Sequence, residues 1–232
     1  MGNLFDIEGG FFRFLTKLGD MVILSVLTFF MCLPVITIGP SITALYYVAL
    51  KTVRDEEGYV FKSFFKSFKQ NFLQGFLLEV ILAVLCAVYY FDYGILNNWI
   101  AAEGSVVAIL IRAMLIGFML VTLVASMYVF PILAKFENKT LRICMNAIMM
   151  GIRHLPSSIM MILITAALAF VTYMYPIALI FTIGAMAFLN SFLLNRIFDF
   201  YIPKDDRNPD EYHVEEAVAQ MESEKEKEQE EL

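Results

Sequence analysis

Long apolar runs dominate this sequence and place the narrowest limit on its fold. A helix needs about 20 apolar residues to cross the hydrocarbon core of a bilayer. Hydrophobic residues make up 59% of the chain and charged residues 17%, which leaves too little polar surface to cover one globular core. We therefore predict an all-α, polytopic helical membrane protein. The long apolar runs are residues 19–38, 72–93, 106–131 and 157–194.

Two interruptions divide the apolar part into about six predicted spans. The last run is twice the required length and is broken at residues 173–176, Tyr-Met-Tyr-Pro, so it should form two helices. A shorter apolar piece, residues 41–53, follows Gly39-Pro40, and Ser41 at its start is a natural N-cap. This piece is either a short span or a re-entrant helix. The predicted membrane domain is residues 1–198, with spans near 19–38, 41–53, 72–93, 106–131, 157–173 and 177–194.

Lysine and arginine are distributed unevenly among the connecting segments. The connectors 92–105 and 173–176 contain neither residue, whereas the other polar segments are basic. Because basic loops stay in the cytoplasm, both termini and the basic segments are predicted to be cytoplasmic. The piece 41–53 must then cross or re-enter the membrane. The basic residues are Arg13, Lys17, Lys51, Arg54, Lys62, Lys66, Lys69, Lys135, Lys139, Arg142, Arg153 and Arg196.

The C-terminal end is strongly acidic. Residues 199–232 contain 13 acidic and 4 basic side chains, whereas the rest of the chain contains 10 acidic and 13 basic ones. A segment of this kind buries too little apolar area to offset its chain entropy. We predict an acidic cytoplasmic tail that keeps the protein soluble at this end; a partner-binding tail is the alternative.

The most regular pattern outside the spans lies in residues 58–72. Five phenylalanines recur at i, i+3, i+4, i+7 and i+11, and lysines occupy the other face. This pattern predicts a cytoplasmic amphipathic helix that lies among lipid headgroups or presents a docking face to a partner. Nucleic acid fits poorly, because the basic run is short and the phenylalanines need burial. The candidate face consists of Phe61, Phe64, Phe65, Phe68, Phe72, Lys62, Lys66 and Lys69.

Residues 128–156 repeat this arrangement loosely. A Tyr-Val pair, a basic segment, an apolar-striped helix and a further span follow in the same order as after Tyr47-Val48. The order favours a repeat of span, cytoplasmic helix and span. The apolar stripe of the second helix is Leu141, Met145, Ile148 and Ile152.

Residues 33–47, Leu-Pro-Val-Ile-Thr-Ile-Gly-Pro-Ser-Ile-Thr-Ala-Leu-Tyr-Tyr, resemble the YesL family, also called domain of unknown function 624. Leu4-Phe5 with Gly9-Gly10 and the stretch 54–58 fit the same pattern. The family consists of bacterial integral membrane proteins that are commonly encoded beside sugar ABC-transporter and glycan-utilisation genes. The resemblance implies a multi-pass protein of the plasma membrane in a carbohydrate-related setting. It supplies no catalytic residues.

Two ionisable residues, Glu79 and Arg112, lie several residues inside the predicted spans, where each costs about 2.5–3.5 kcal/mol on insertion scales. Glu79 lies about 10 Å from the cytoplasmic start of its span. It should face the bundle interior and meet a base such as Arg196, or be protonated. Arg112 should extend outward or meet Asp92 or Glu103. Structural pairing is the favoured role for both, and for Glu79 a place on a solute or proton path is the alternative.

The Gly39-Pro40 break has two interpretations of the same kind. A fold-defining turn is favoured, but broken helices also line substrate sites in transporters. These two residues and the two ionisable ones complete the candidate intramembrane polar sites.

No enzyme motif is present. The sequence lacks a glycine-rich phosphate loop, zinc-ligand spacing and a serine elbow, and His154 and His213 have no evident partners. We therefore predict no catalytic, cofactor-binding or metal-binding residue. The first functional hypothesis is a non-enzymatic accessory component of carbohydrate uptake or sensing, which docks a sugar ABC transporter or another protein on its basic cytoplasmic face. The second is a transport subunit or small permease with a path near Glu79 and the Gly39-Pro40 break. The third is a structural or lipid-responsive membrane protein.

Overall fold

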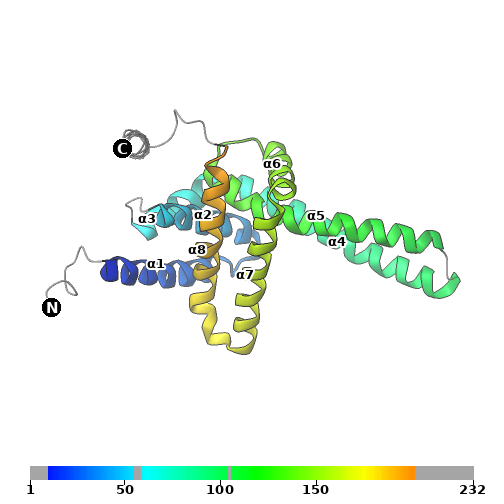
Figure 1. Ribbon diagram of the computed structural model, residues 1–232, viewed down its shortest axis with the longest axis horizontal. Coiled ribbons are helices and arrows are strands. Elements are labelled where there is room, and N and C mark those ends of the chain that lie inside the picture. Colours follow the sequence, from blue (N-terminus) through cyan, green and yellow to red (C-terminus); the bar gives the residue numbers. More distant parts are fainter. Residues whose placement is uncertain (1–9, 55–58, 104–105, 202–232) are drawn as a thin grey trace, which may run out of the picture. The chain divides into compact units, whose positions relative to one another are not determined.

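The computed structural model describes residues 10–54, 59–103 and 106–201, with side chains omitted at 10–14 and 101–103. Within these ranges the chain forms eight α-helices and two short 3-10 helices (Figure 1). It divides into two compact units, residues 1–194 and 195–232, and each is described by itself. Most of the acidic tail lies outside the described residues. The helices are α1 (Gly10–Met31), η1 (Val35–Thr37), α2 (Ile38–Val53), α3 (Val60–Gln70), α4 (Phe72–Glu103), α5 (Val106–Lys135), α6 (Thr140–Arg153), α7 (Leu155–Met174), η2 (Pro176–Ala178) and α8 (Leu179–Phe198).

The predicted fold class is confirmed. No strand occurs in the described ranges, and five helices are long and apolar enough to cross a membrane. Two of them, α7 and α8, divide the apolar run 157–194 at Tyr175 and η2. A hydrogen bond of 2.8 Å joins Thr172 Oγ1 of α7 to Thr182 Oγ1 of α8. The five candidate spans are Val35–Val53, Phe72–Ile100, Val106–Lys135, Leu155–Met174 and Pro176–Phe198.

The first helix ends before Pro34, seven residues short of the predicted span end at residue 38. α1 ends at Met31, and Pro34 caps η1 in an extended conformation. Residues that precede proline disfavour the helical conformation, so Leu33-Pro34 stops α1. Gly39-Pro40 lies inside the first turn of α2 instead, where a proline is tolerated because its missing N–H would have no helical acceptor. The predicted span 19–38 is therefore divided, and Val35–Val53 forms one span-length unit.

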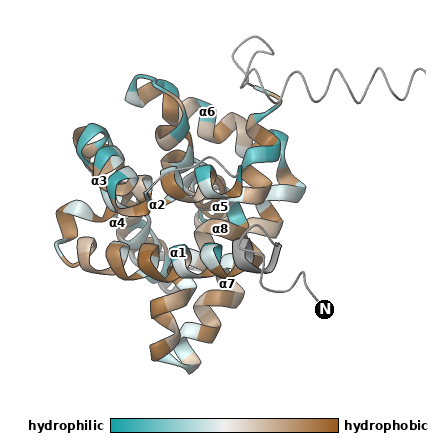
Figure 2. Cartoon of the chain, turned by 90° about the vertical axis from the view of Figure 1, so that its left-hand side faces the viewer, coloured by the Kyte–Doolittle hydropathy of each residue, from teal (hydrophilic) through white to brown (hydrophobic). Residues whose placement is uncertain are grey.

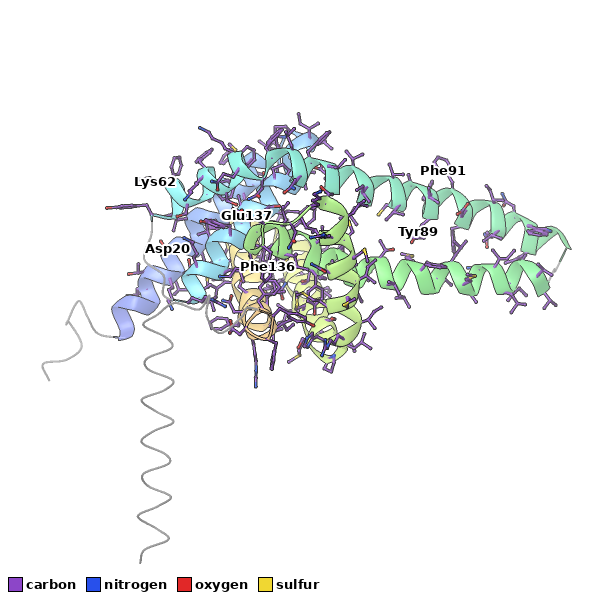
Figure 3. All side chains as sticks on the ribbon, turned by 90° about the horizontal axis from the view of Figure 1, so that it is seen from above. Asp20, Lys62, Tyr89, Phe91, Phe136 and Glu137 are labelled. Carbon is purple, nitrogen blue, oxygen red and sulfur yellow. The ribbon has the colours of Figure 1, made fainter. Side chains whose placement is uncertain are left out.

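α4 and α5 form a long antiparallel hairpin (Figures 1 and 3). α4 continues to Glu103, ten residues past the predicted end of its span, so most of the predicted connector 92–105 is helical. This segment contains no proline to stop the helix. α5 runs through Pro131 to Lys135, past its predicted end.

α2 is the central helix of residues 1–194. It packs against α1, α3, α4 and α5. Ten of its residues are buried, and several of them are small: Gly39, Ser41, Ala44 and Ala49. Small side chains allow helix backbones to approach closely, which is how helices associate within lipid.

The two short amphipathic helices occupy matching places in the chain. α3 follows α2 and packs against it, and α6 follows α5 and packs against it. α2 and α5 also pack against each other. This pairing agrees with the loose repeat in the sequence. The apolar stripe of α6 is exposed at Leu141, Met145, Ile148 and Ile152.

Candidate functional site

The backbones of α2 and α4 touch at two glycines. A Cβ atom added to Gly39 would lie within about 3 Å of Gly75 backbone atoms, and one added to Gly75 would lie 2.9 Å from the Pro40 nitrogen. Neither position has room for a side chain. Gly75 was not singled out from the sequence, although it lies one helical turn before Glu79 and therefore on the same face of α4.

Glu79 closes this junction from the α4 side. Its Oε2 atom accepts a hydrogen bond of 2.9 Å from the Gly39 backbone N–H, in the first turn of α2. The first-turn N–H groups of a helix have no acceptor within the helix, and the N-terminal end of the dipole favours a carboxylate. Glu79 thus faces the packed interior, as its cost in lipid predicted. Its observed partner is this helix start.

Pro40 has a matching role in the junction. As the third residue of α2 it donates no backbone hydrogen bond and none is required there. Gly39, one residue earlier, supplies the N–H group that Glu79 binds, and Thr43 Oγ1 donates to the Gly39 carbonyl at 2.9 Å. Four residues, Gly39, Pro40, Gly75 and Glu79, therefore hold the start of α2 against α4 through a helix cap and a close backbone contact. We refer to them as the α2–α4 junction.

The aromatic face of α3 is mostly turned inward. Phe64 is fully buried, and Phe65 and Phe68 are partly buried. The predicted helix 58–72 is shorter in the structure, because α3 ends at Gln70, so the partly buried Phe72 is the first residue of α4. Phe61 is exposed, as are Lys62, Lys66 and Lys69. Lys62 extends outward in Figure 3, and hydrophilic colour follows this side of α3 in Figure 2. The outward surface of α3 is therefore lysine-rich with one phenylalanine.

The two basic segments line one polar groove of about 700 Å³. Lys66 comes from α3, whereas Lys135 ends α5 and Lys139 precedes α6, some 70 residues later in the chain. A hydrogen bond of 3.1 Å from Gln74 Nε2, in the first turn of α4, to the Asn138 carbonyl holds the second segment at the start of α4. The remaining lining consists of Tyr47, Gln70, Asn71, Gln74, Leu133, Ala134, Phe136, Glu137 and Asn138, with Phe136 and Glu137 labelled in Figure 3.

This arrangement, which we call the basic groove, has an excess of positive charge. Three lysines oppose one carboxylate, Glu137, and four side-chain amides supply further donors and acceptors. A groove of this chemistry suits an anionic, hydrogen-bonding surface. The amides were not singled out from the sequence, because only the fold brings Gln74 next to Asn138.

Arg112 lies far from the junction in sequence and contacts other partners. Its Nη2 donates to Tyr93 Oη at 3.0 Å, and its Nη1 lies 3.4 Å from Asn97 Oδ1. The guanidinium carbon lies 4.8 Å from the centre of the Tyr93 ring. Arg112 therefore binds the neutral residues Tyr93 and Asn97, whereas the sequence suggested Asp92 as its partner. The other suggested partner, Glu103, lies outside the described side chains.

Among the described residues, no group of three or more histidine, cysteine or acidic side chains could hold a metal ion. The three cysteines, Cys32, Cys86 and Cys144, are free.

The helices, the α2–α4 junction and the basic groove together define an all-α polytopic membrane protein with a polar, lysine-rich end. Residues 21–93 match the model of the family described as protein of unknown function, DUF624, which confirms the resemblance. The match contains α2, α3 and the whole α2–α4 junction, whereas the α5–α6 side of the basic groove lies outside it. No curated protein and no solved structure matches the chain.

Proposed function

We propose that this protein is a non-enzymatic accessory component of carbohydrate uptake or sensing, which docks a partner through the basic groove. One observation carries the proposal: two basic segments far apart in the chain line a single groove, and the Gln74–Asn138 hydrogen bond joins the second segment to the start of α4. Basic loops that serve only to set the orientation of a membrane protein need to lie on the same side of the membrane, and they need not contact one another. Their convergence in a concave, amide-lined surface favours recognition.

The proposal includes the orientation of the protein. The lysines on the groove favour a cytoplasmic location, with both termini on the same side of the plasma membrane. A partner would then approach from the cytoplasm. The carbohydrate setting rests on the family resemblance, and a cytoplasm-facing acidic segment of a sugar ABC transporter has the required chemistry.

The exposed lysines of α3 extend the same surface. Lys62, Lys66 and Lys69 are spaced i, i+4 and i+7, so they share one face of the helix. Phe61, which is 61% exposed, adds an apolar anchor beside them. Phe64 is unsuitable as a docking residue, because its ring is completely buried.

The geometry at the α2–α4 junction supports the docking function over the permease alternative. A solute path at this point would have to separate Gly39 from Gly75, whose backbones are in contact. It would also have to break the Glu79–Gly39 hydrogen bond. A structural role for the junction requires neither change.

The test uses charge reversal on the two sides of the groove. Lys66→Glu and Lys139→Glu should together abolish co-purification of the partner from a mild-detergent extract, because each change replaces attraction by repulsion. Arg142→Glu is the matched control: Arg142 is exposed on α6 and does not line the groove. If the wild type, the Lys66→Glu/Lys139→Glu double variant and Arg142→Glu all recover the same partner equally, docking at the groove is contradicted.

A second measurement separates the two functions. The purified protein in sealed vesicles should produce no flux of sugars, and Glu79→Gln should leave partner co-purification unchanged. Solute flux that depends on Glu79 would support the permease and overturn the proposal.

A further inference from the structure

A half-open groove of about 560 Å³ lies between α4 and α5. It runs from Leu82 and Ser126 at one end to Leu96 and Arg112 at the other. Few residues in the apolar stretches of the helices that form it are buried, 11% in α4 and 6% in α5, so the groove opens toward the surroundings of the hairpin. In Figure 3 Tyr89 points from α4 toward α5, whereas Phe91 points away from the hairpin.

Three hydroxyl groups in the middle of the groove, those of Tyr89, Thr122 and Ser126, are already paired. Tyr89 Oη lies 2.9 Å from Thr122 Oγ1, which donates to the Phe118 carbonyl at 2.9 Å. Ser126 Oγ donates to the Leu123 carbonyl at 2.7 Å. A wall whose hydroxyls are satisfied has little to offer a polar ligand and accepts an apolar one at low cost. The occupant of this part must therefore be apolar.

One end of the groove has the opposite chemistry. Arg112 is held by the Tyr93 hydroxyl and ring and by Asn97, all of which are neutral. A guanidinium has five N–H donors, and these two hydrogen bonds use only part of them. The remaining donors, and a positive charge that no described carboxylate contacts, suit a phosphate oxygen, for which arginine is the best-matched side chain.

The length of the groove fits a lipid chain. Leu82 to Leu96 covers about 21 Å along α4 at the helical rise per residue. One leaflet of the hydrocarbon core is about 15 Å thick, or half of the full 30 Å. The groove can therefore receive an acyl chain along the depth of a leaflet while Arg112 remains near the headgroup level.

From this combination we infer that the α4–α5 groove is a binding site for one phospholipid. An acyl chain lies along the apolar wall between Tyr89 and Ser126, and the phosphate accepts hydrogen bonds from Arg112. Because Arg112 lies on the side of the basic-free connector, the lipid belongs to the leaflet opposite the basic groove. This site is independent of partner docking.

Lipid binding can be measured by native mass spectrometry of the full chain in mild detergent, after delipidation and addition of phosphatidylglycerol. The wild-type protein should retain one lipid, and Arg112→Gln should weaken retention about tenfold or more through loss of charge-assisted hydrogen bonds. Diacylglycerol with the same chains, which lacks the phosphate, should bind the wild type as weakly as phosphatidylglycerol binds Arg112→Gln.

A second pair of variants tests the chain-binding part. Met119→Trp places a large ring in the groove, whereas Leu120→Trp places it on the adjacent position of α5, outside the groove; the two side chains are 55% and 57% exposed. Only Met119→Trp should reduce lipid retention, with both variants monodisperse. Equal retention by wild type and Arg112→Gln would overturn the inference. A dimer that Met119→Trp dissociates, with lipid retention unchanged, would instead identify a second copy of the chain as the occupant and would also overturn it.

Discussion

The span formed by η1 and α2 and the span formed by α5 are both apolar and long enough to cross a membrane. In a soluble protein the more apolar of two helices is expected to be the more buried, but here the relation is reversed. In the span Val35–Val53, the apolar stretch of 18 residues has a mean hydropathy of 1.2, and 56% of its residues are buried. In Val106–Lys135, the corresponding stretch has a mean hydropathy of 2.5, and 6% of its residues are buried. The more apolar stretch is the more exposed one. In a bilayer, lipid surrounds the exposed side chains, so strong hydropathy marks contact with lipid and does not mark the protein interior.

Where α2 packs against its neighbours, small side chains and hydrogen-bonding groups characterise the buried positions more than strong hydropathy does. α2 buries glycine, serine, threonine and alanine residues, and Gly39 and Gly75 allow α2 and α4 to touch. The outer part of the α4–α5 hairpin has glycines as well, but a Cβ atom added to Gly94 or Gly117 would meet nothing within 4 Å. The same residue type is therefore indispensable in one region and replaceable in the other.

The largest expected effect follows directly from this contrast. Gly39→Ala and Gly75→Ala should each lower the free energy of unfolding by about 3 kcal/mol, because the new methyl group meets backbone atoms that cannot move aside easily. The measurement is reversible unfolding in mixed micelles. Gly94→Ala and Gly117→Ala are the matched controls and should be neutral or stabilise by up to about 1 kcal/mol. Equal effects at all four positions would remove the distinction between the two regions.

The next effect concerns the Glu79 cap. Glu79→Leu leaves the Gly39 N–H without an acceptor and should cost about 1–3 kcal/mol. Glu79→Gln retains an acceptor oxygen and loses only the charge at the helix start, for a cost below about 1 kcal/mol. Unfolding of the two variants side by side gives the comparison. If Gln is as damaging as Leu, the charge itself holds the junction and the hydrogen bond does not.

A smaller effect sharpens the comparison within α5 itself. The outer part of this helix is exposed, but Tyr128 near its end is fully buried, and its hydroxyl lies 2.8 Å from Ser158 Oγ of α7. Tyr128→Phe should cost about 0.5–1.5 kcal/mol, because Ser158 keeps its bond to the Gly151 carbonyl. Tyr90→Phe, at a side chain that is 78% exposed, should leave the free energy of unfolding unchanged. A cost at Tyr90 equal to that at Tyr128 would mean that burial does not separate these positions.

The smallest effect is a change in reactivity. Burial raises the pKa of the Cys144 thiol on α6 above its ordinary value. Since the thiolate is the reactive form, alkylation of Cys144 in a variant with Cys32→Ala and Cys86→Ala should increase only at higher pH than in the same chain unfolded in detergent. The measurement is the pH profile of modification by a water-soluble maleimide. Superimposable profiles for the folded and unfolded chains would show that α6 does not shield this residue.

Several features could be predicted from residue order alone. The apolar runs identify a helical membrane protein, and the period of residues 61–72 identifies α3 as amphipathic. The cost of a carboxylate in lipid already required Glu79 to face the interior. Its partner could not be predicted, because the Gly39 N–H becomes an unpaired donor only when α2 begins at Ile38 rather than after Pro40. The position of that break depends on whether Pro34 or Pro40 stops the helix, and the local sequence around each proline permits a break.

For the same reason the inward turn of the α3 phenylalanines was not determined by their spacing. An apolar stripe fits a lipid interface, a partner or a neighbouring helix equally well, and packing of α3 on α2 decided in favour of the neighbour for Phe64. The basic groove likewise required Lys66 and Lys139 to meet across the ends of different helices.

Composition and periodicity by themselves determined the membrane class and the apolar segments, because the cost of exposing backbone and charge to hydrocarbon acts on each segment separately. Only the tertiary structure decided which apolar helix is central, which hydrogen bond Glu79 makes and which lysines share a groove. Those outcomes depend on distances between residues far apart in the chain, and close backbone contact at two glycines sets the distance between α2 and α4.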